Sequence, residues 1–293
     1  TVASALATVG LDMDGHTWTR RHVARARAVL LIAGLPLVAT LARHLGDDGA
    51  GWAVVSLPAV LHDEDLQRVA AGILAGLGTP FYSINGGDGL WLRGLSAPDR
   101  DPGSFGGYGR NDLHIDAPNV TCPPDYTSLL ILRPDLAGGG ASVIGDLRAA
   151  MAALPEQDQD VLRQPVFFEG RADRLHGVGE SYLPFPILDD GPRYGWVRWA
   201  GKLLSDDRNR GHLPVLERFA QHLDQHVHQM MLGRGDLLIA DQRRVAHGRE
   251  PLGAQDGIPD ARRRLLCQAK VRFEAAAPVQ HLIIYSRGDH DGH

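Results

Sequence analysis

The chain has 293 residues, 44% apolar and 22% charged, a balance typical of a globular protein that buries a large core. Its formal net charge of −5 argues against a generic binder of nucleic acids or anionic membranes. The only two cysteines, Cys122 and Cys267, are too few for a disulfide framework and form no Cys-x-x-Cys pair. They argue against a zinc ribbon and favour a reducing, cytoplasmic location.

The first part of the chain is expected to be mainly helical. Residues 18–45 have apolar positions at helical spacing, with Pro36 as a break. The most apolar stretch there, residues 28–42, is too short to span a bilayer and is interpreted as a buried helix pair. A β-branched run predicts a strand over residues 51–57, and residues 62–77 predict a helix whose early acidic residues suit its positive end.

The rest of the chain is expected to be richer in strands. Residues 83–112 have loop composition, and a long loop in a compact domain is often functional. Strands are predicted over 127–133, 141–144, 237–240 and 265–273, helices over 146–154 and 214–231, and irregular β structure over 165–204. This order favours an α+β fold with a mainly β core. We expect one domain, with a helical segment over 1–50, the core over about 51–275 and a flexible tail over 286–293.

His114 and Asp116 are candidate metal ligands. In a strand, side chains two residues apart lie on one face, so both could bind one ion. A second histidine would complete the two-histidine, one-carboxylate set of non-haem iron(II) oxygenases. The pair alone is weak evidence for a metal site, because a surface histidine beside a solvated aspartate gives the same pattern. His222, His226 and His228, on the predicted helix 214–231, are interpreted as solvated.

Two later segments strengthen this hypothesis. His247 follows the predicted strand 237–240 and supplies the third ligand. An arginine run, Arg262 to Arg264, then opens the last predicted strand. The planar fork of an arginine donates two parallel hydrogen bonds to a carboxylate, so this run is a candidate anion clamp.

Together these features resemble the taurine dioxygenase and clavaminate synthase-like superfamily of iron(II)- and 2-oxoglutarate-dependent oxygenases. The resemblance covers about residues 50–275 and rests on four segments in the family's order: His114-Ile-Asp116, Gly139-Gly-Ala-Ser142, Gln242-Arg-Arg-Val-Ala-His-Gly-Arg249 and Arg264-Leu-Leu-Cys-Gln268. It implies a double-stranded β-helix, a jelly roll of cupin type, with flanking helices. It also implies Fe(II) as cofactor, and 2-oxoglutarate and dioxygen as co-substrates.

The resemblance assigns roles to individual residues. His114, Asp116 and His247 would be the iron ligands, and no other catalytic side chain is expected. Arg264 would pair with the C5 carboxylate of 2-oxoglutarate, and Ser142 would donate a hydrogen bond to the same end. Arg262 and Arg263 compete with Arg264 for this role. Arg264 is preferred because it directly precedes the Leu-Leu pair.

One position departs from the family's pattern. Many relatives carry a second arginine four residues after the clamp, where it holds an anionic group of the substrate, but this chain has Gln268. A neutral amide favours a polar, uncharged group or a weaker anion contact, so sulfonate specificity is not expected. Arg110 and Asn111 in the long loop, and Arg198 in the middle segment, are further candidate substrate residues. The alternatives are a polar surface loop and a buried core strand.

The resemblance implies hydroxylation of an aliphatic C–H of a small molecule, an amino acid or an intermediate of natural-product or antibiotic biosynthesis. A desaturase, epimerase or cyclase of the same family, and a non-catalytic cupin-like metal-binding protein, remain open alternatives. The expected partner is a small-molecule substrate, with no nucleic acid and no membrane.

Overall fold

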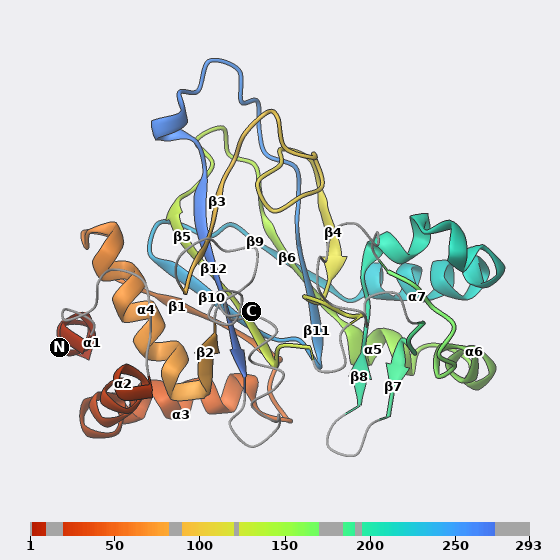
Figure 1. Ribbon diagram of the computed structural model, residues 1–293, viewed down its shortest axis with the longest axis horizontal. Helices are drawn as coiled ribbons and strands as arrows, with labels where there is room; N and C mark the ends of the chain where they lie inside the picture. The colour runs from red at the N-terminus through yellow and green to blue at the C-terminus, as the bar shows by residue number, and fades with distance from the viewer. Residues whose placement is uncertain are drawn as a thin grey trace, which may run out of the picture.

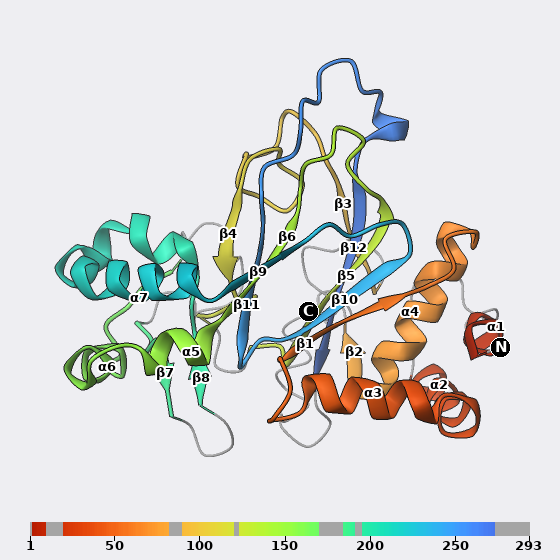
Figure 2. The same ribbon diagram turned by 180° about the vertical axis from the view of Figure 1, so that it is seen from behind.

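The computed structural model describes residues 2–9, 20–81, 90–119, 123–169, 184–190 and 195–272. Within them, helices gather on two opposite sides of a central β structure (Figures 1 and 2). One side holds α1 (Val2–Val9), α2 (Arg20–Ala33), α3 (Leu35–Leu45) and α4 (Asp63–Leu77). The other side holds α5 (Leu147–Ala152), α6 (Glu156–Leu162) and α7 (Leu213–Gln225), with the short helices η3 (Gly201–Ser205) and η4 (Asp207–His212).

The strands form two main antiparallel sheets. The larger sheet has the order β1-β10-β5-β12-β2, with β3 also paired to β12; its strands are β1 (Trp52–Ser56), β2 (Thr79–Phe81), β3 (Leu92–Leu95), β5 (Tyr126–Arg133), β10 (Asp236–Asp241) and β12 (Leu265–Arg272). The smaller sheet has the order β4-β11-β6-β9; its strands are β4 (Asn111–His114), β6 (Ser142–Asp146), β9 (Val227–Met230) and β11 (Val245–Arg249). A hairpin of β7 (Leu188–Asp189) and β8 (Trp196–Val197) lies beside them, and η5 (Asp260–Arg262) precedes β12.

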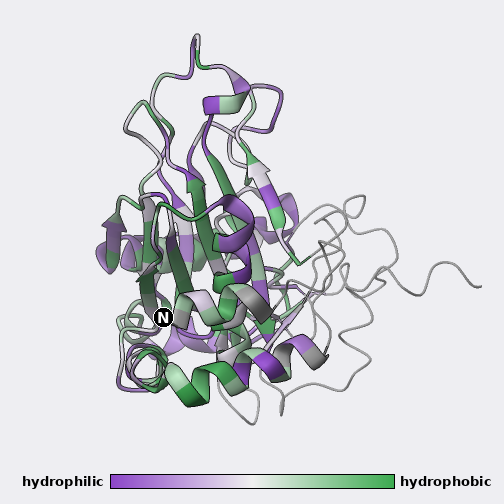
Figure 3. Ribbon diagram, turned by 90° about the vertical axis from the view of Figure 1, so that its left-hand side faces the viewer, coloured by the Kyte–Doolittle hydropathy of each residue, from purple (hydrophilic) through white to green (hydrophobic). Residues whose placement is uncertain are grey.

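Three hydrophobic clusters explain how the layers pack. One joins α1–α4 to the larger sheet, and a second joins α5 and α7 to the smaller sheet. A third, smaller cluster contains residues of both sheets and therefore lies between them. Figure 3 shows apolar residues along the N-terminal helices and along the strands behind them. The expectation of an α+β fold is thus confirmed at the level of mixed helices and sheets.

The alternation along β12 decides which of its side chains reach the interior. Leu265, Cys267, Ala269 and Val271 belong to the cluster under α1–α4, whereas Leu266 belongs to the cluster between the sheets. Since successive strand residues point to opposite faces, the even-numbered residues of β12 face the space between the sheets. Gln268 and Lys270 are therefore interior residues.

Several predicted elements need correction. The helix predicted over residues 214–231 ends at Gln225, and Val227–Met230 form strand β9 instead. Pairing with the edge of β6 overrides the helical spacing there, so His226 and His228 do not share a helix with His222. The predicted loop 83–112 contains strand β3, and the break between α2 and α3 falls at Gly34, with Pro36 in the first turn of α3.

The other predicted helices and strands are present within one or two residues of their expected ends. Cys122, residues 83–89 of the predicted loop and the tail 286–293 lie outside the described residues, as does part of the segment 165–204. Cys267 is a free, buried thiol. In the described part of the chain, no single helix meets the length and hydropathy needed to cross a membrane, although the bent pair α2–α3 meets them jointly.

Candidate metal centre

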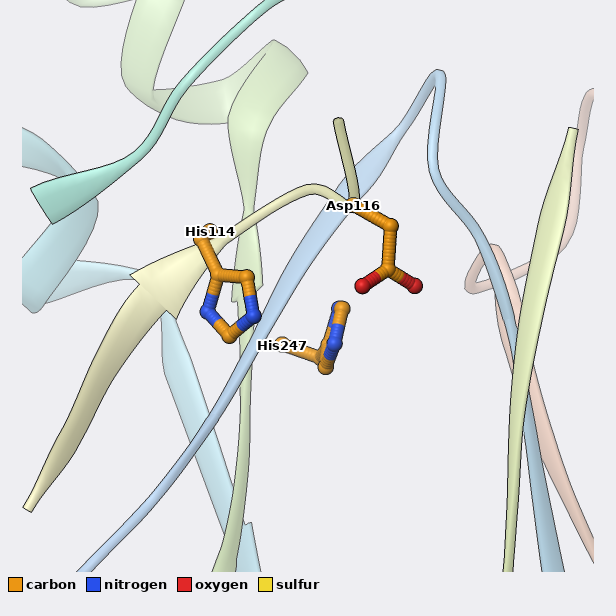
Figure 4. Close-up of side chains that lie close together, drawn as sticks. All are labelled: His114, Asp116 and His247. Atoms are coloured by element: carbon orange, nitrogen blue, oxygen red, sulfur yellow. The ribbon is translucent and has the colours of Figure 1, made fainter. Parts of the chain in front are cut away.

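The three predicted metal ligands meet between the two sheets. His114 is the last residue of β4, and its partner across the β4–β11 ladder is His247. Their ring centroids lie 4.4 Å apart, and Asp116 follows two residues after the end of β4. One ligand atom from each residue lies within 4.8 Å of the other two, and Figure 4 shows the three side chains converging. This spacing is compatible with a single bound ion.

The backbone after β4 turns Asp116 toward the site. Ile115 donates its N–H to the Trp199 carbonyl at 2.8 Å and buries its side chain fully among the core residues of the smaller sheet. The Asp116 N–H donates to Gln242 Oε1 at 2.5 Å, and the Gln242 amide in turn donates to the Pro124 carbonyl at 2.9 Å. Gln242 belongs to the motif that carries His247, so this segment positions two ligands. No role was predicted for Gln242 from the sequence.

Two residues of β12 contact the Asp116 carboxylate. Gln268 Nε2 lies 3.1 and 3.3 Å from its two oxygens and also donates to Thr127 Oγ1 at 3.1 Å. The Lys270 ammonium lies 3.8 Å from Asp116 Oδ1. Burial alone would raise the pKa of Asp116, but the charge of Lys270 is the largest of the influences that lower it, and together they hold the pKa well below its usual range. The carboxylate is therefore ionised and held in place for a cation.

Both histidines are suited to metal binding. The His114 Nδ1–H donates to the Asp112 carbonyl at 2.7 Å, which leaves Nε2 as the lone-pair nitrogen. Burial, together with His114, lowers the pKa of His247 to about 3, so its ring is neutral at physiological pH. Its Nδ1 is buried with no hydrogen-bond partner among the described residues. Two imidazoles and one carboxylate fit iron(II).

A buried arginine lies near the other end of the site. Arg264 is 4% exposed, and no described residue accepts a hydrogen bond from its guanidinium. Burial and the nearby charge of Arg249 lower the pKa of Arg264 to about 10, although Asp135 acts to raise it. A buried cation without an acceptor is costly unless a ligand supplies the anion. Its environment therefore fits a carboxylate ligand.

The Gly-Gly turn and β11 contribute to this anion site. A Cβ on Gly140 would lie 3.5 Å from Arg264 Nε, so the turn passes close to the guanidinium. Ser142 begins β6 and pairs in register with Arg249 on β11. Arg249 is buried, and its Nε has no hydrogen-bond partner in the described part of the chain. No role was predicted for Arg249 from the sequence, but its charge adds to that of Arg264.

The competing arginines are placed differently. Arg263 forms an ion pair with Asp260 at 2.7 Å and donates to the Ile258 carbonyl, and Arg262 is exposed. Neither is a buried cation that lacks an acceptor. The geometry thus favours Arg264 over both as the anion-binding arginine.

The other candidate substrate residues do not gather at the metal. Arg198 is buried, but its guanidinium is bound to Asp189 at 2.6 Å and to the Pro118 carbonyl at 3.1 Å. These contacts tie the β7–β8 hairpin to the segment after Asp116. Arg110 is half exposed and lies 3.7 Å from Asp112, while Asn111 begins β4 opposite Arg249. Gln268 does lie at the metal site, but its amide nitrogen is already bound to Asp116.

Comparisons with known proteins agree with this geometry. Residues 34–171 and 204–269 match the model of the taurine catabolism dioxygenase TauD, TfdA family. Among solved structures, the chain is similar to an asparagine oxygenase in complex with Fe(II), 2S,3S-3-hydroxyasparagine and succinate, with a TM-score of 0.74 and 20% identity over 92% of this chain and 90% of that one. It is also similar to the non-heme iron oxygenase OrfP in complex with Fe and alpha-ketoglutaric acid, with a TM-score of 0.72 and 18% identity over 92% of this chain and 91% of that one. No curated protein matches by sequence.

The family match covers most of the chain, including all three predicted metal ligands and Arg264. It confirms the enzyme class expected from the sequence, and with it iron(II) and 2-oxoglutarate as cofactor and co-substrate. The chain therefore belongs to the TauD/TfdA family of iron(II)- and 2-oxoglutarate-dependent oxygenases.

Proposed function

We propose that the protein is a dioxygenase that hydroxylates an aliphatic C–H of a small molecule, an amino acid or a related biosynthetic intermediate. In this proposal the two facing sheets form a double-stranded β-helix within a single domain. The observation that carries it is the pairing of a converging His114, Asp116 and His247 with a buried, unpaired Arg264. A protein that only stored metal would have no use for that cation.

Each group of residues would have a separate role. His114, Asp116 and His247 would hold iron(II), which together with 2-oxoglutarate and dioxygen supplies the oxidising chemistry when bound. Arg264 would bind the C5 carboxylate of 2-oxoglutarate, with Ser142 and Arg249 beside it, and so orient the keto acid end toward the metal. Gln268 and Gln242 would fix Asp116 in its ligating orientation. Because Asp116 fills the carboxylate position, a halide has no free site there, and halogenation is disfavoured.

The amino-acid substrate is supported by the similar structures. The asparagine oxygenase was crystallised with a hydroxyasparagine, and OrfP with hydroxylated forms of L-Arg. Their low sequence identity to this chain leaves the side chain of the substrate open. Desaturation, epimerisation and ring formation use the same metal site and remain the alternatives. The cytoplasmic location stays a prediction.

An anaerobic titration followed by product analysis tests the proposal. Iron(II) and 2-oxoglutarate should together give a metal-to-ligand charge-transfer band, and a panel of amino acids should then be screened for a change in that band. On adding oxygen, hydroxylation would give succinate and a product heavier by one oxygen atom, whereas desaturation would give a product lighter by two hydrogens. Absence of both the band and succinate formation would contradict the proposed function.

A further inference from the structure

A second interior cation lies at the metal end of the site. Lys270 follows Gln268 by two residues on β12, so both side chains project into the space between the sheets. The Lys270 side chain is 12% exposed, and its ammonium lies 3.8 Å from Asp116 Oδ1. Asp116 is the one ion-pair partner of Lys270 among the described residues.

The residue type at this position is rare in the chain. Of its 30 basic residues, Lys202 and Lys270 are the only lysines. An arginine presents a planar fork, whereas a lysine carries a compact charge with three donors on a flexible four-carbon stem. Lys270 can therefore turn its ammonium from Asp116 toward a neighbouring carboxylate without any movement of the strand.

Charge balance indicates what such a lysine would bind. Histidine ligands bind a metal as neutral imidazoles, so a divalent ion is neutralised by Asp116 together with one carboxylate of 2-oxoglutarate. When Asp116 also binds the metal, its negative charge is shared and no longer fully balances the positive charge of Lys270. The C5 carboxylate of 2-oxoglutarate, bound at Arg264, is too far away to pair with Lys270. Arg264 and Lys270 are six residues apart along the strand, which corresponds to roughly 20 Å. An additional anion next to the metal would complete the balance.

We propose that Lys270 binds the carboxylate of the substrate, and that the substrate is a small molecule with a free carboxylate, such as a free amino acid. This inference rests on the proposed function. It revises the expectation, drawn from Gln268, that the substrate is uncharged at this end: Gln268 is engaged with Asp116, and the cation stands two residues further along the same strand face. A substrate tethered to a carrier through its carboxylate is excluded.

The test compares free L-amino acids with their carboxamides. Both sets are titrated anaerobically into the complex with iron(II) and 2-oxoglutarate, and the charge-transfer band reports binding. At least one free amino acid should bind the wild type at least tenfold more tightly than its carboxamide. Lys270→Met should weaken binding of the free amino acid at least tenfold and abolish its preference over the carboxamide. Lys270→Arg should restore most of the binding and of the preference. The matched control is Lys202→Met at the exposed second lysine, which should keep the preference.

The two lysines allow a second readout. Reductive methylation followed by mass spectrometry should show that the bound amino acid protects Lys270 and leaves Lys202 reactive. An acid-over-amide preference that survives in Lys270→Met would overturn the proposal. So would an effect of Lys270→Met confined to 2-oxoglutarate affinity or to iron affinity, or a wild-type band that no amino acid perturbs. A wild type that forms no band at all would instead refute the proposed function.

Discussion

Two of the predicted metal ligands are held in place by hydrogen bonds to other residues of the chain. Asp116 is fixed at its backbone by Gln242 and at its carboxylate by Gln268, and the His114 ring is fixed by the Asp112 carbonyl. We predict that His114→Ala, Asp116→Ala and His247→Ala each abolish iron binding and turnover, because a three-ligand site loses affinity steeply with one ligand. Iron content after anaerobic loading measures this. The exposed His226→Ala is the control, and full iron content in any of the three variants would refute the ligand assignment.

Gln268 contacts the carboxylate of Asp116, a predicted metal ligand. Removing a residue that orients a metal ligand typically lowers metal affinity or activity by about 10- to 100-fold. We therefore expect Gln268→Ala to weaken iron(II) binding within that range while leaving the KM for 2-oxoglutarate nearly intact. Gln229→Ala, at an exposed position on β9, should change neither quantity. An unchanged iron affinity in Gln268→Ala would mean that its contact with Asp116 is incidental.

Arg264 is expected to act on the co-substrate. Truncating one partner of a buried, hydrogen-bonded charge pair costs about 2–5 kcal/mol, so Arg264→Ala should raise the KM for 2-oxoglutarate more than tenfold. Thermal stabilisation of the protein by 2-oxoglutarate should be lost in parallel, since a ligand stabilises only the state that it binds. Arg263→Ala removes an arginine already paired with Asp260 and should leave both quantities unchanged. The reverse result would place the clamp at Arg263.

At the scale of elements, the turn between β5 and β6 passes close to Arg264, the predicted anion-binding arginine. Asp135 accepts hydrogen bonds from the backbone of Ala137, Gly139 and Gly253 and from the Gln255 amide, and so joins this turn to residues 253–255. Gly140 has a φ of +74°, and a Cβ there would lie 2.6 Å from Leu252 Cδ2. The positive φ favours glycine at this position, and a larger residue would also have to push aside the Leu252 side chain.

Gly138 and Gly140 form a matched pair for testing the turn. Both have positive φ, but a Cβ on Gly138 meets nothing within 4 Å. Each alanine substitution should cost about 1–2 kcal/mol for the left-handed backbone. Only Gly140→Ala should also displace the Leu252 side chain, which lies beside the same position as Arg264, and raise the KM for 2-oxoglutarate. Denaturant unfolding and steady-state kinetics would separate the two effects, and equal KM values in the two variants would contradict this role.

At the scale of the whole molecule, stability should depend on pH through His247. Its folded-state pKa of about 3 lies below the value near 6.5 of an unfolded histidine. Between these values the unfolded chain binds more protons, so the metal-free protein should lose stability as the pH falls from about 6.5 toward 3. Apo His247→Gln should show a shallower loss between pH 6.5 and 4.5 in thermal unfolding. An identical slope would show that other groups dominate.

Local pattern was enough to predict much of the fold. Strand β5 and helix α4 follow from their apolar spacing and flanking residues, and both lie where expected. Val227–Met230 could not be predicted in the same way, because their apolar spacing suits a helix and only the unpaired edge of β6 makes them a strand. Spacing describes a segment alone, whereas strand pairing depends on a partner far away in the chain.

The same division holds for the site. The sequence by itself determined the donor types and their order along the chain, and the family that this order indicates: His114 with Asp116, a later His247, and an arginine opening the last strand. Only the tertiary structure showed that Arg198 is bound to Asp189, that Gln268 holds Asp116, and that Lys270 lies beside it. The physical reason is that a side chain's role depends on which partners neutralise its charge or fill its hydrogen bonds. For these residues the partners come from other strands and loops, at separations that no local motif encodes.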